Sequence, residues 1–287
     1  MRYNIVRNWI DSFDLMTKKS FVTVPFIIWG FLEILALIFI YFSTGTPFMH
    51  ITNPLIKKFF GEVFLHYPAN LFIMPTLYYY ANLLIFAAIG VFLSAVTIDL
   101  VGKVDAQTPL KTRSMLEEAL RRYGPCLVYA ILIVLVGVLV RNLHAFGFGK
   151  VLRYFSRHLP QIAWDMMPFI SALSLLVLRI AFYAFLILTI PIIVIKKKPF
   201  IKALGESAFK GLLNFFAIFT LLLVPYLICS PVLLVKIFYK ELMEATFVEM
   251  VFFVTLGGIV IIKLVECYTT ICITRFLLDK ERLTKEG

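Results

Sequence analysis

Four ionisable residues interrupt the long apolar runs of this sequence, and they are its strongest candidates for chemistry. They are Glu33, Arg179, Lys263 and Glu266. A charged side chain inside a membrane is costly and needs a partner, so each marks either a structural ion pair or a site for a substrate or proton. The two acids and two bases cancel, which favours pairing among themselves.

The depths of these residues indicate which pairs could form. At 1.5 Å of helical rise per residue, Glu33, Arg179 and Lys263 lie roughly 18–26 Å from the ends of their runs that are predicted to be cytoplasmic. Glu33 could therefore reach either Arg179 or Lys263, while Glu266 is one turn from Lys263 and could pair with it locally. Two interpretations stay open: a fixed ion pair that sets helix packing, or the substrate or proton site of a transporter.

Six apolar runs must hold these charges in place. The chain is 61% hydrophobic and 16% charged, with a mean hydropathy of +0.92, whereas soluble chains are about a quarter charged. Each run has the ~20 residues needed to cross a bilayer, and their continuity favours helices over barrel strands. The expected spans are residues 22–42, 71–98, 123–140, 166–195, 211–235 and 250–274. We predict an all-α polytopic membrane protein, with residues 1–287 forming a single transmembrane domain of six helices.

The basic residues fall unevenly around these runs. Of the 28 Lys and Arg residues, 18 lie in the two termini and in the loops that follow spans two and four. Because cytoplasmic segments carry the excess of Lys and Arg, both termini are predicted to be cytoplasmic, in a multi-pass protein of the cytoplasmic (inner) membrane. The net charge of +11 is then a topology signal, and no nucleic-acid partner is expected.

A similar segment precedes spans one, three and five, at residues 13–19, 116–122 and 204–210. Each has apolar residues, a nearby acid and a basic residue just before the membrane. We predict three helical hairpins, each opened by an amphipathic helix at the inner interface, although the positive-inside bias alone could create the similarity. The basic residues expected to contact anionic headgroups are Lys18, Lys19, Arg121, Arg122, Lys196, Lys197, Lys198 and Lys210. Two segments on the other side, residues 54–65 and 150–159, are also expected to be interfacial helices.

Two spans have features that affect packing. Pro225 and Pro231 in span five should break or kink its helix, as happens near transporter binding sites and also in ordinary packed spans. Tyr78 and Asn82 in span two are polar groups of the kind that hold helices together, and the small residues 87–90 allow a close helix contact.

No catalytic, cofactor-binding or metal-ligating set is recognisable, because the sequence lacks motifs such as G-x-S-x-G, H-E-x-x-H and C-x-x-C. We therefore expect a non-enzymatic integral membrane protein without a cofactor, which organises or assists a membrane complex or a lipid or envelope process. Its expected partners are the lipid bilayer with its anionic inner-leaflet headgroups, and either a membrane-protein partner or a second copy. The alternative is a small transporter or permease component that uses the mid-membrane charges.

The three segments at residues 13–19, 116–122 and 204–210, each before a long apolar run, resemble a loose group of bacterial six-span membrane families of unknown function. They are similar to the membrane domain fused to some glycerophosphodiester phosphodiesterases. The resemblance implies a six-span helical fold. It implies no catalytic activity for this sequence, since only residues 276–287 follow the last run and no functional residue of that family maps onto it.

Overall fold

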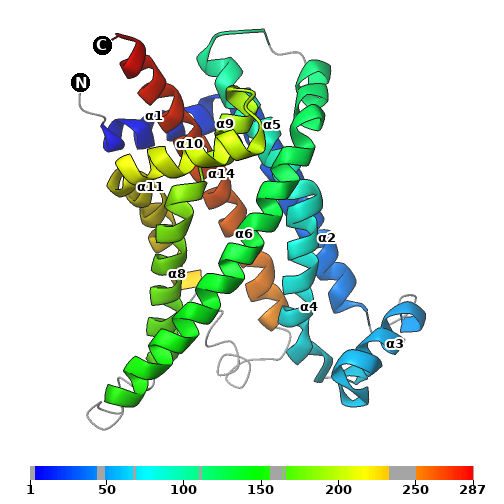
Figure 1. The fold of residues 1–287 in the computed structure, drawn as a ribbon. Helices are drawn as coiled ribbons and strands as arrows, with labels where there is room; N and C mark the ends of the chain where they lie inside the picture. Colours follow the sequence, from blue (N-terminus) through cyan, green and yellow to red (C-terminus); the bar gives the residue numbers. More distant parts are fainter. Residues whose placement is uncertain are drawn as a thin grey trace.

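The computed structural model describes residues 4–43, 49–66, 69–109, 112–155, 164, 166–232 and 250–286, and every regular element in these ranges is a helix (Figure 1). Five helices are long and apolar enough to cross a membrane, or six if one bent pair counts as a single span. The prediction of an all-α, multi-pass membrane protein is confirmed to that extent, and the sixth span stays a prediction.

The first two predicted spans are helical over nearly their whole lengths. Span one is α2, Val24–Tyr41. Span two begins as α4, Ala69–Ile85, passes through a π-helical turn at Phe86–Gly90, and continues as α5, Val91–Asp105. It therefore extends seven residues beyond the predicted end at residue 98.

The prediction of a separate lead-in helix before the third span is wrong. α6 is one helix of 44 residues, Thr112–Phe155. It includes the predicted lead-in at residues 116–122, the span itself, and the first part of residues 150–159, which were expected to form an interfacial helix. Residues 116–122 are Leu, Glu, Ala and Arg, which favour helix, and nothing among them ends a helix. Residues 156–159 lie outside the described part of the chain.

The fourth span contains a break that the sequence analysis missed. α8, Met167–Leu186, is followed by a two-residue turn at Ile187 and Leu188 and then by α9, Thr189–Ile195. Pro191 explains the break, because a proline has no N–H to donate to the carbonyl four residues earlier, here that of Ile187.

The fifth predicted span is bent at its start. α10, Phe200–Leu213, meets α11, Phe215–Ile228, at 90°. Pro225 lies inside α11 without ending it, and the helix ends at Ile228, three residues before Pro231. The predicted kink at these prolines stays a prediction. Residues 233–235 lie outside the described chain. The last helix, α14, runs from Met250 to Glu286 and exceeds the predicted end at residue 274.

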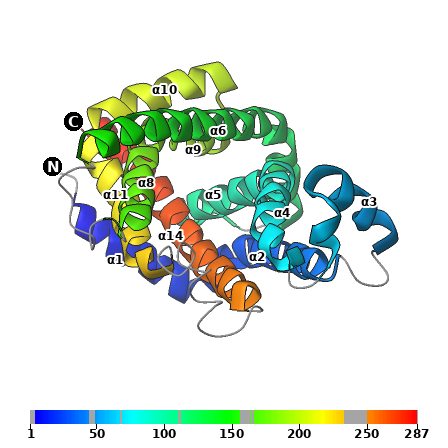
Figure 2. The same cartoon turned by 90° about the horizontal axis from the view of Figure 1, so that it is seen from below.

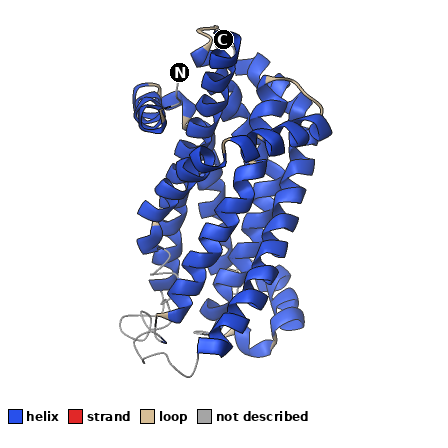
Figure 3. Cartoon of the chain, turned by 60° about the vertical axis from the view of Figure 1, so that its left-hand side comes forward, coloured by secondary structure: helices blue, strands red, loops and turns tan. Residues whose placement is uncertain are grey.

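Both chain ends lie at one end of the helix bundle, which we call the terminal face (Figures 1 and 3). Two helices lie across the spans there: α1, Ile5–Lys18, and α10. The first and third predicted lead-ins are thus helices distinct from the spans that follow them. At the opposite end lies α3, Met49–Phe60, which confirms the helix predicted over residues 54–65 in its first part.

The helix α5 occupies the middle of the bundle when it is viewed along the spans (Figure 2). It contacts α2, α6, α9 and α14. Its side chains Val91, Ala95 and Ile98 are buried in the largest apolar cluster, together with residues of α8, α9, α11 and α14. Contacts on several sides explain why α5 carries no charge before Asp99.

The contact between α10 and α8 depends on small residues. Ala203, Ser207 and Gly211 form the buried face of α10, and the Ser207 hydroxyl donates to the Phe185 carbonyl at 3.0 Å. A Cβ added to Gly211 would lie 2.7 Å from the Phe185 Cα and 2.8 Å from the Ala184 carbonyl oxygen. Both of these atoms belong to the backbone, so they cannot move aside without separating the helices.

We expect Gly211→Ala to lower the melting temperature of the detergent-purified protein, because the added methyl group forces α10 away from α8. The matched control is Gly205→Ala on the same helix, where the new Cβ meets nothing within 4 Å and alanine should stabilise the helix by up to about 1 kcal/mol. Equal melting temperatures for the two variants would contradict the close contact.

Candidate functional site

The candidate site centres on the ammonium group of Lys263, in α14. Its Nζ lies 2.8 Å from Glu33 Oε1, in α2, and 2.7 Å from Glu266 Oε2, three residues further along α14. Three of the four predicted charges are therefore brought together, and Glu33 takes Lys263 rather than Arg179 as its partner. We call these three residues, with Trp29 and Tyr78, the Lys263 cluster.

An aromatic ring and a phenol complete the cluster. The Trp29 ring, one turn before Glu33 on α2, lies with its centroid 3.5 Å from Lys263 Nζ, which is a cation–π contact. The Tyr78 hydroxyl, from α4, donates to Glu33 Oε2 at 3.1 Å. The second carboxylate oxygen of Glu33 is thereby satisfied, and three spans meet at one buried group.

Two glycines make room for Trp29 and Lys263. A Cβ on Gly30 would lie 3.3 Å from Lys263 Cγ, and a Cβ on Gly90 would lie 2.5 Å from the Trp29 ring. Gly90 is the last residue of the π-helical turn, whose first residue, Phe86, stacks on Trp29 with ring centroids 5.9 Å apart. The turn therefore brings both a small residue and an aromatic ring against the same indole.

The three charged side chains of the cluster differ in their exposure to solvent. The Glu33 and Lys263 side chains are only 2% and 8% exposed, whereas Glu266 is 27% exposed. Two carboxylates face one ammonium, so the cluster carries one excess negative charge when all three groups are ionised. The arrangement can hold three helices in register, and its most exposed carboxylate is the one on the same helix as Lys263.

Arg179 does not join this cluster. It lies in α8, it makes no ion pair with any residue that the structure describes, and its Nε is buried without a hydrogen-bond partner there. The predicted four-residue charge site is therefore reduced to three of its members. Similar depth along a span, which suggested the fourth, does not fix the side of the helix on which a residue lies.

Tyr78 and Gly90 were predicted to take part in helix packing only, and no role was predicted for Trp29. Tyr78 does hold helices together, as predicted, through its hydrogen bond to Glu33. A sequence signal for Trp29 exists, because it precedes Glu33 by four residues and so shares its helix face.

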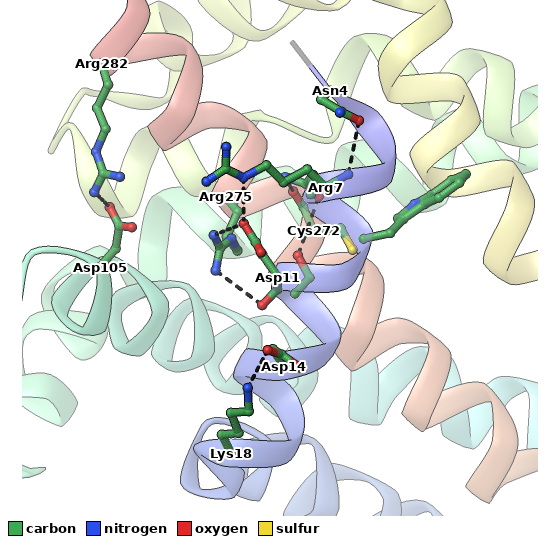
Figure 4. Close-up of polar contacts among 12 residues, drawn as sticks. Asn4, Arg7, Asp11, Asp14, Lys18, Asp105, Cys272, Arg275 and Arg282 are labelled. Carbon is green, nitrogen blue, oxygen red and sulfur yellow. Dashed lines mark hydrogen bonds and ion pairs between the residues drawn. The ribbon is translucent and has the colours of Figure 1, made fainter.

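A second polar region joins α1 to α14 at the terminal face (Figure 4). Arg275 Nη2 lies 3.1 Å from Asp11 Oδ2, the Asn8 amide donates to the Cys272 carbonyl at 3.3 Å, and the Tyr268 hydroxyl donates to the Trp9 carbonyl at 3.1 Å. Asn8 and Ser12 are buried. The helix α1 is thus attached by polar groups.

Several basic residues expected at headgroups are instead engaged within the protein. Glu206, in α10, accepts Lys196 at 2.5 Å, Lys198 at 2.6 Å and Lys210 at 3.0 Å. Burial opposes the ionisation of Glu206, but the hydrogen bonds from Lys196, Lys198 and Lys210 outweigh it and lower its pKa to about 2.

Of the other basic residues expected to contact headgroups, some form ion pairs within the protein and some do not. Lys197 pairs with Glu118 at 2.5 Å and Lys18 pairs with Asp14 at 2.5 Å. Lys19 and Arg121 are exposed, whereas Arg122 is half-buried and donates to the Lys197 carbonyl at 3.4 Å. Lys19 and Arg121 are thus the members of the predicted set for which the structure shows neither an ion pair nor a side-chain hydrogen bond.

Comparison with known proteins yields no relative. No family model matches the chain, and no curated protein or solved structure matches it significantly. The resemblance to bacterial six-span families stays an expectation.

We expect Lys263→Met to lower the free energy of unfolding by about 3–5 kcal/mol, because it leaves the Glu33 carboxylate buried without its cation. The double variant Lys263→Met/Glu33→Gln should recover most of this loss, since neither buried side chain is then charged. Reversible unfolding in mixed micelles measures both. Lys18→Met is the control, because its exposed pair with Asp14 contributes at most about 1 kcal/mol. A double variant no more stable than the single one would show that pairing is not the cause.

Acid should weaken the Glu206 network. The Glu206 pKa is depressed in the folded protein, so its stabilising contribution is present above the ordinary value of 4.5 and is lost as the pH falls towards 2. We expect wild type to melt at a higher temperature than Glu206→Gln at pH 7, and the difference to shrink below pH 4.5. Glu117→Gln is the control, because its pair with Arg113 is exposed. A difference that does not change with pH would contradict this assignment.

Proposed function

We propose that this chain is a non-enzymatic multi-pass protein of the cytoplasmic membrane that organises inner-leaflet lipid, or a complex assembled there. The observation that carries the proposal is a row of large apolar side chains on α10 and the start of α11 that the bundle leaves exposed. These residues form what we call the apolar ridge: Ile201, Phe209, Leu212, Leu213 and Phe216. Their exposed fractions range from 63% to 83%.

The lipid of the inner leaflet is the occupant that best fits the apolar ridge. α10 stands at 90° to the helix that follows it, and it lies across the end of the spans rather than along them. A helix in this position whose apolar face is unpartnered matches those that bury their apolar side at the boundary between headgroups and acyl chains. The exposed Lys202 beside the ridge suits anionic headgroups.

The first helix also leaves apolar side chains exposed. α1 attaches through Asn8 and Ser12 and through half-buried apolar residues such as Trp9, whereas Val6, Ile10 and Phe13 are more than half exposed. In a soluble protein the apolar stripe of a surface helix faces the core. Apolar side chains on the outward sides of two helices at one face favour a lipid environment there.

We also propose that both chain ends are cytoplasmic and that six spans follow one another as hairpins. The loops and termini at the terminal face carry 18 of the 28 basic residues, which supports a cytoplasmic location for both chain ends. Successive spans contact each other throughout, α2 with α4, α5 with α6, α6 with α8, α8 with α11 and α11 with α14. These contacts support six spans that pack in chain order, and the grouping into three hairpins rests on the sequence pattern.

The transporter hypothesis has less support. Its site would be the Lys263 cluster, but Glu33 and Lys263 are almost fully enclosed and satisfy each other, and Arg179 lies elsewhere. Enclosure of this kind favours a structural ion pair. A transport site needs groups that a substrate can reach.

Spin labels test the position of the apolar ridge in the bilayer. In a Cys229→Ser background reconstituted into lipid, we expect labels at Phe209→Cys and Phe216→Cys to be relaxed by oxygen more than by a water-soluble nickel chelate, because the ridge lies in lipid. A label at Lys202→Cys on the same helix is the control and should show the reverse. We also expect Phe209→Ser/Phe216→Ser to retain fewer phosphatidylglycerol molecules in native mass spectrometry. Ridge labels as exposed to nickel as the control would overturn the proposal.

A further inference from the structure

A cavity of about 430 Å³ opens on the terminal face, between the ends of α5, α9 and α14 and against Glu118 of α6. This volume falls within the range of about 300–1,000 Å³ found for small-molecule sites. Seven charged residues line it: Asp99, Lys103, Asp105, Glu118, Lys197, Glu281 and Arg282. The cavity shares no residue with the Lys263 cluster or with the apolar ridge.

Six of the seven lining charges form three ion pairs, Asp99 with Lys103 at 2.6 Å, Glu118 with Lys197 at 2.5 Å, and Asp105 with Arg282 (Figure 4). The seventh, Glu281, pairs outside the lining with Lys196 at 2.5 Å and Lys210 at 3.4 Å. A lining in which carboxylates and cations stand side by side is complementary to a ligand that also carries both signs.

Two of these ion pairs can exchange partners with a ligand. The cations Lys197 and Arg282 are 59% and 54% exposed, whereas their partners Glu118 and Asp105 are 27% and 20% exposed. Ion pairs that reach solvent in this way contribute only about 0–1 kcal/mol. An incoming ammonium can therefore replace Lys197 or Arg282 on its carboxylate, and the released cation is then available to an anionic group on the same ligand.

Two helices end at the cavity with a left-handed residue. Among the described residues other than glycine, Gln107 and Lys197 are the two with positive φ, at 52° and 55°. Each directly follows the C-cap of its helix, α5 or α9, which is a common way for a helix to end. These ends place Lys197 in the lining and Gln107 between the lining residues Ala106 and Thr108.

We propose that this cavity binds a small zwitterion whose ammonium contacts Asp105 or Glu118 and whose anionic group contacts Arg282 or Lys197. The same chemistry occurs in a free amino acid and in the headgroup of phosphatidylethanolamine. This inference does not rest on the proposed function, because the cavity and the apolar ridge are separate.

The test uses the full chain in nanodiscs of phosphatidylglycerol and measures the binding of 4-aminobutyrate by calorimetry. We expect saturable binding, and at least tenfold weaker binding of butylamine and of butyrate, which each carry one of the two charges. Asp105→Asn and Glu118→Gln should each weaken binding at least tenfold. Glu117→Gln, on α6 beside Glu118 but outside the lining, should bind as wild type does.

A second arm distinguishes a lipid headgroup from a free solute. Nanodiscs that contain phosphatidylethanolamine, phosphatidylcholine and phosphatidylglycerol are analysed for retained lipid. Selective retention of phosphatidylethanolamine that Asp105→Asn abolishes identifies the headgroup as the ligand, since the choline group cannot donate hydrogen bonds. Saturable 4-aminobutyrate binding without this selectivity identifies a free solute. If neither probe binds selectively to wild type, or if Asp105→Asn and Glu118→Gln leave both unchanged, the proposal is wrong.

If either variant proves unstable, Lys197→Gln provides the check from the opposite side of the cavity. It removes a cation that is already half exposed, so folding should be unaffected. It should weaken the binding of either zwitterion, and unaltered binding would contradict the proposed contact with the anionic group.

Discussion

The buried ammonium of Lys263 is the constraint on which the spans depend. An isolated charge in an apolar interior is too costly to persist, so Lys263 requires a carboxylate from another helix, and Glu33 of α2 supplies it at 2.8 Å. Glu33 in turn requires a donor for its other oxygen, which Tyr78 of α4 provides. A shift of α2 along α14 by one turn, about 5.4 Å, would separate the ion pair. The cluster therefore fixes the relative depth and rotation of α2, α4 and α14 inside the bundle, away from the polar contacts of the terminal face.

Polar contacts have a different role at the terminal face. There they attach α1 through Asp11 and Asn8, and they join the ends of α9, α10 and α14 through Glu206 and Glu281. Because polar and small residues of α1 and α10 take part in the attachment, several large apolar side chains of both helices are left on the outward side. The same molecule thus buries charged groups that position its spans and exposes apolar surface at one end. This distribution is the reverse of that in soluble proteins, and a membrane makes it favourable.

Much of the architecture was predictable from the sequence, and the exceptions have physical causes. Hydropathy identified the apolar runs, and spacing identified the Lys263–Glu266 pair, because residues three apart share a helix face. The choice between Lys263 and Arg179 for Glu33 was not predictable, since distance along a helix does not specify rotation about its axis. Pro191 was overlooked within an apolar run, although it breaks span four. Lys210 was assigned to lipid although Glu206, four residues earlier on the same helix, was predictable as a partner. The second partner, Glu281, was not predictable because it is more than 70 residues away in sequence.

The π-helical turn at Phe86–Gly90 determines how span two tolerates changes in length. Such a turn is a local widening of the helix, and it separates the half that carries Tyr78 from the half that carries Asp99. Loss of one residue there would rotate one half against the other by about 100°. Tyr78 and Asp99 could then no longer face Glu33 and the terminal-face cavity together. Insertions and deletions in this span should therefore be accepted only outside residues 78–99, so that the two sites keep a fixed rotational phase.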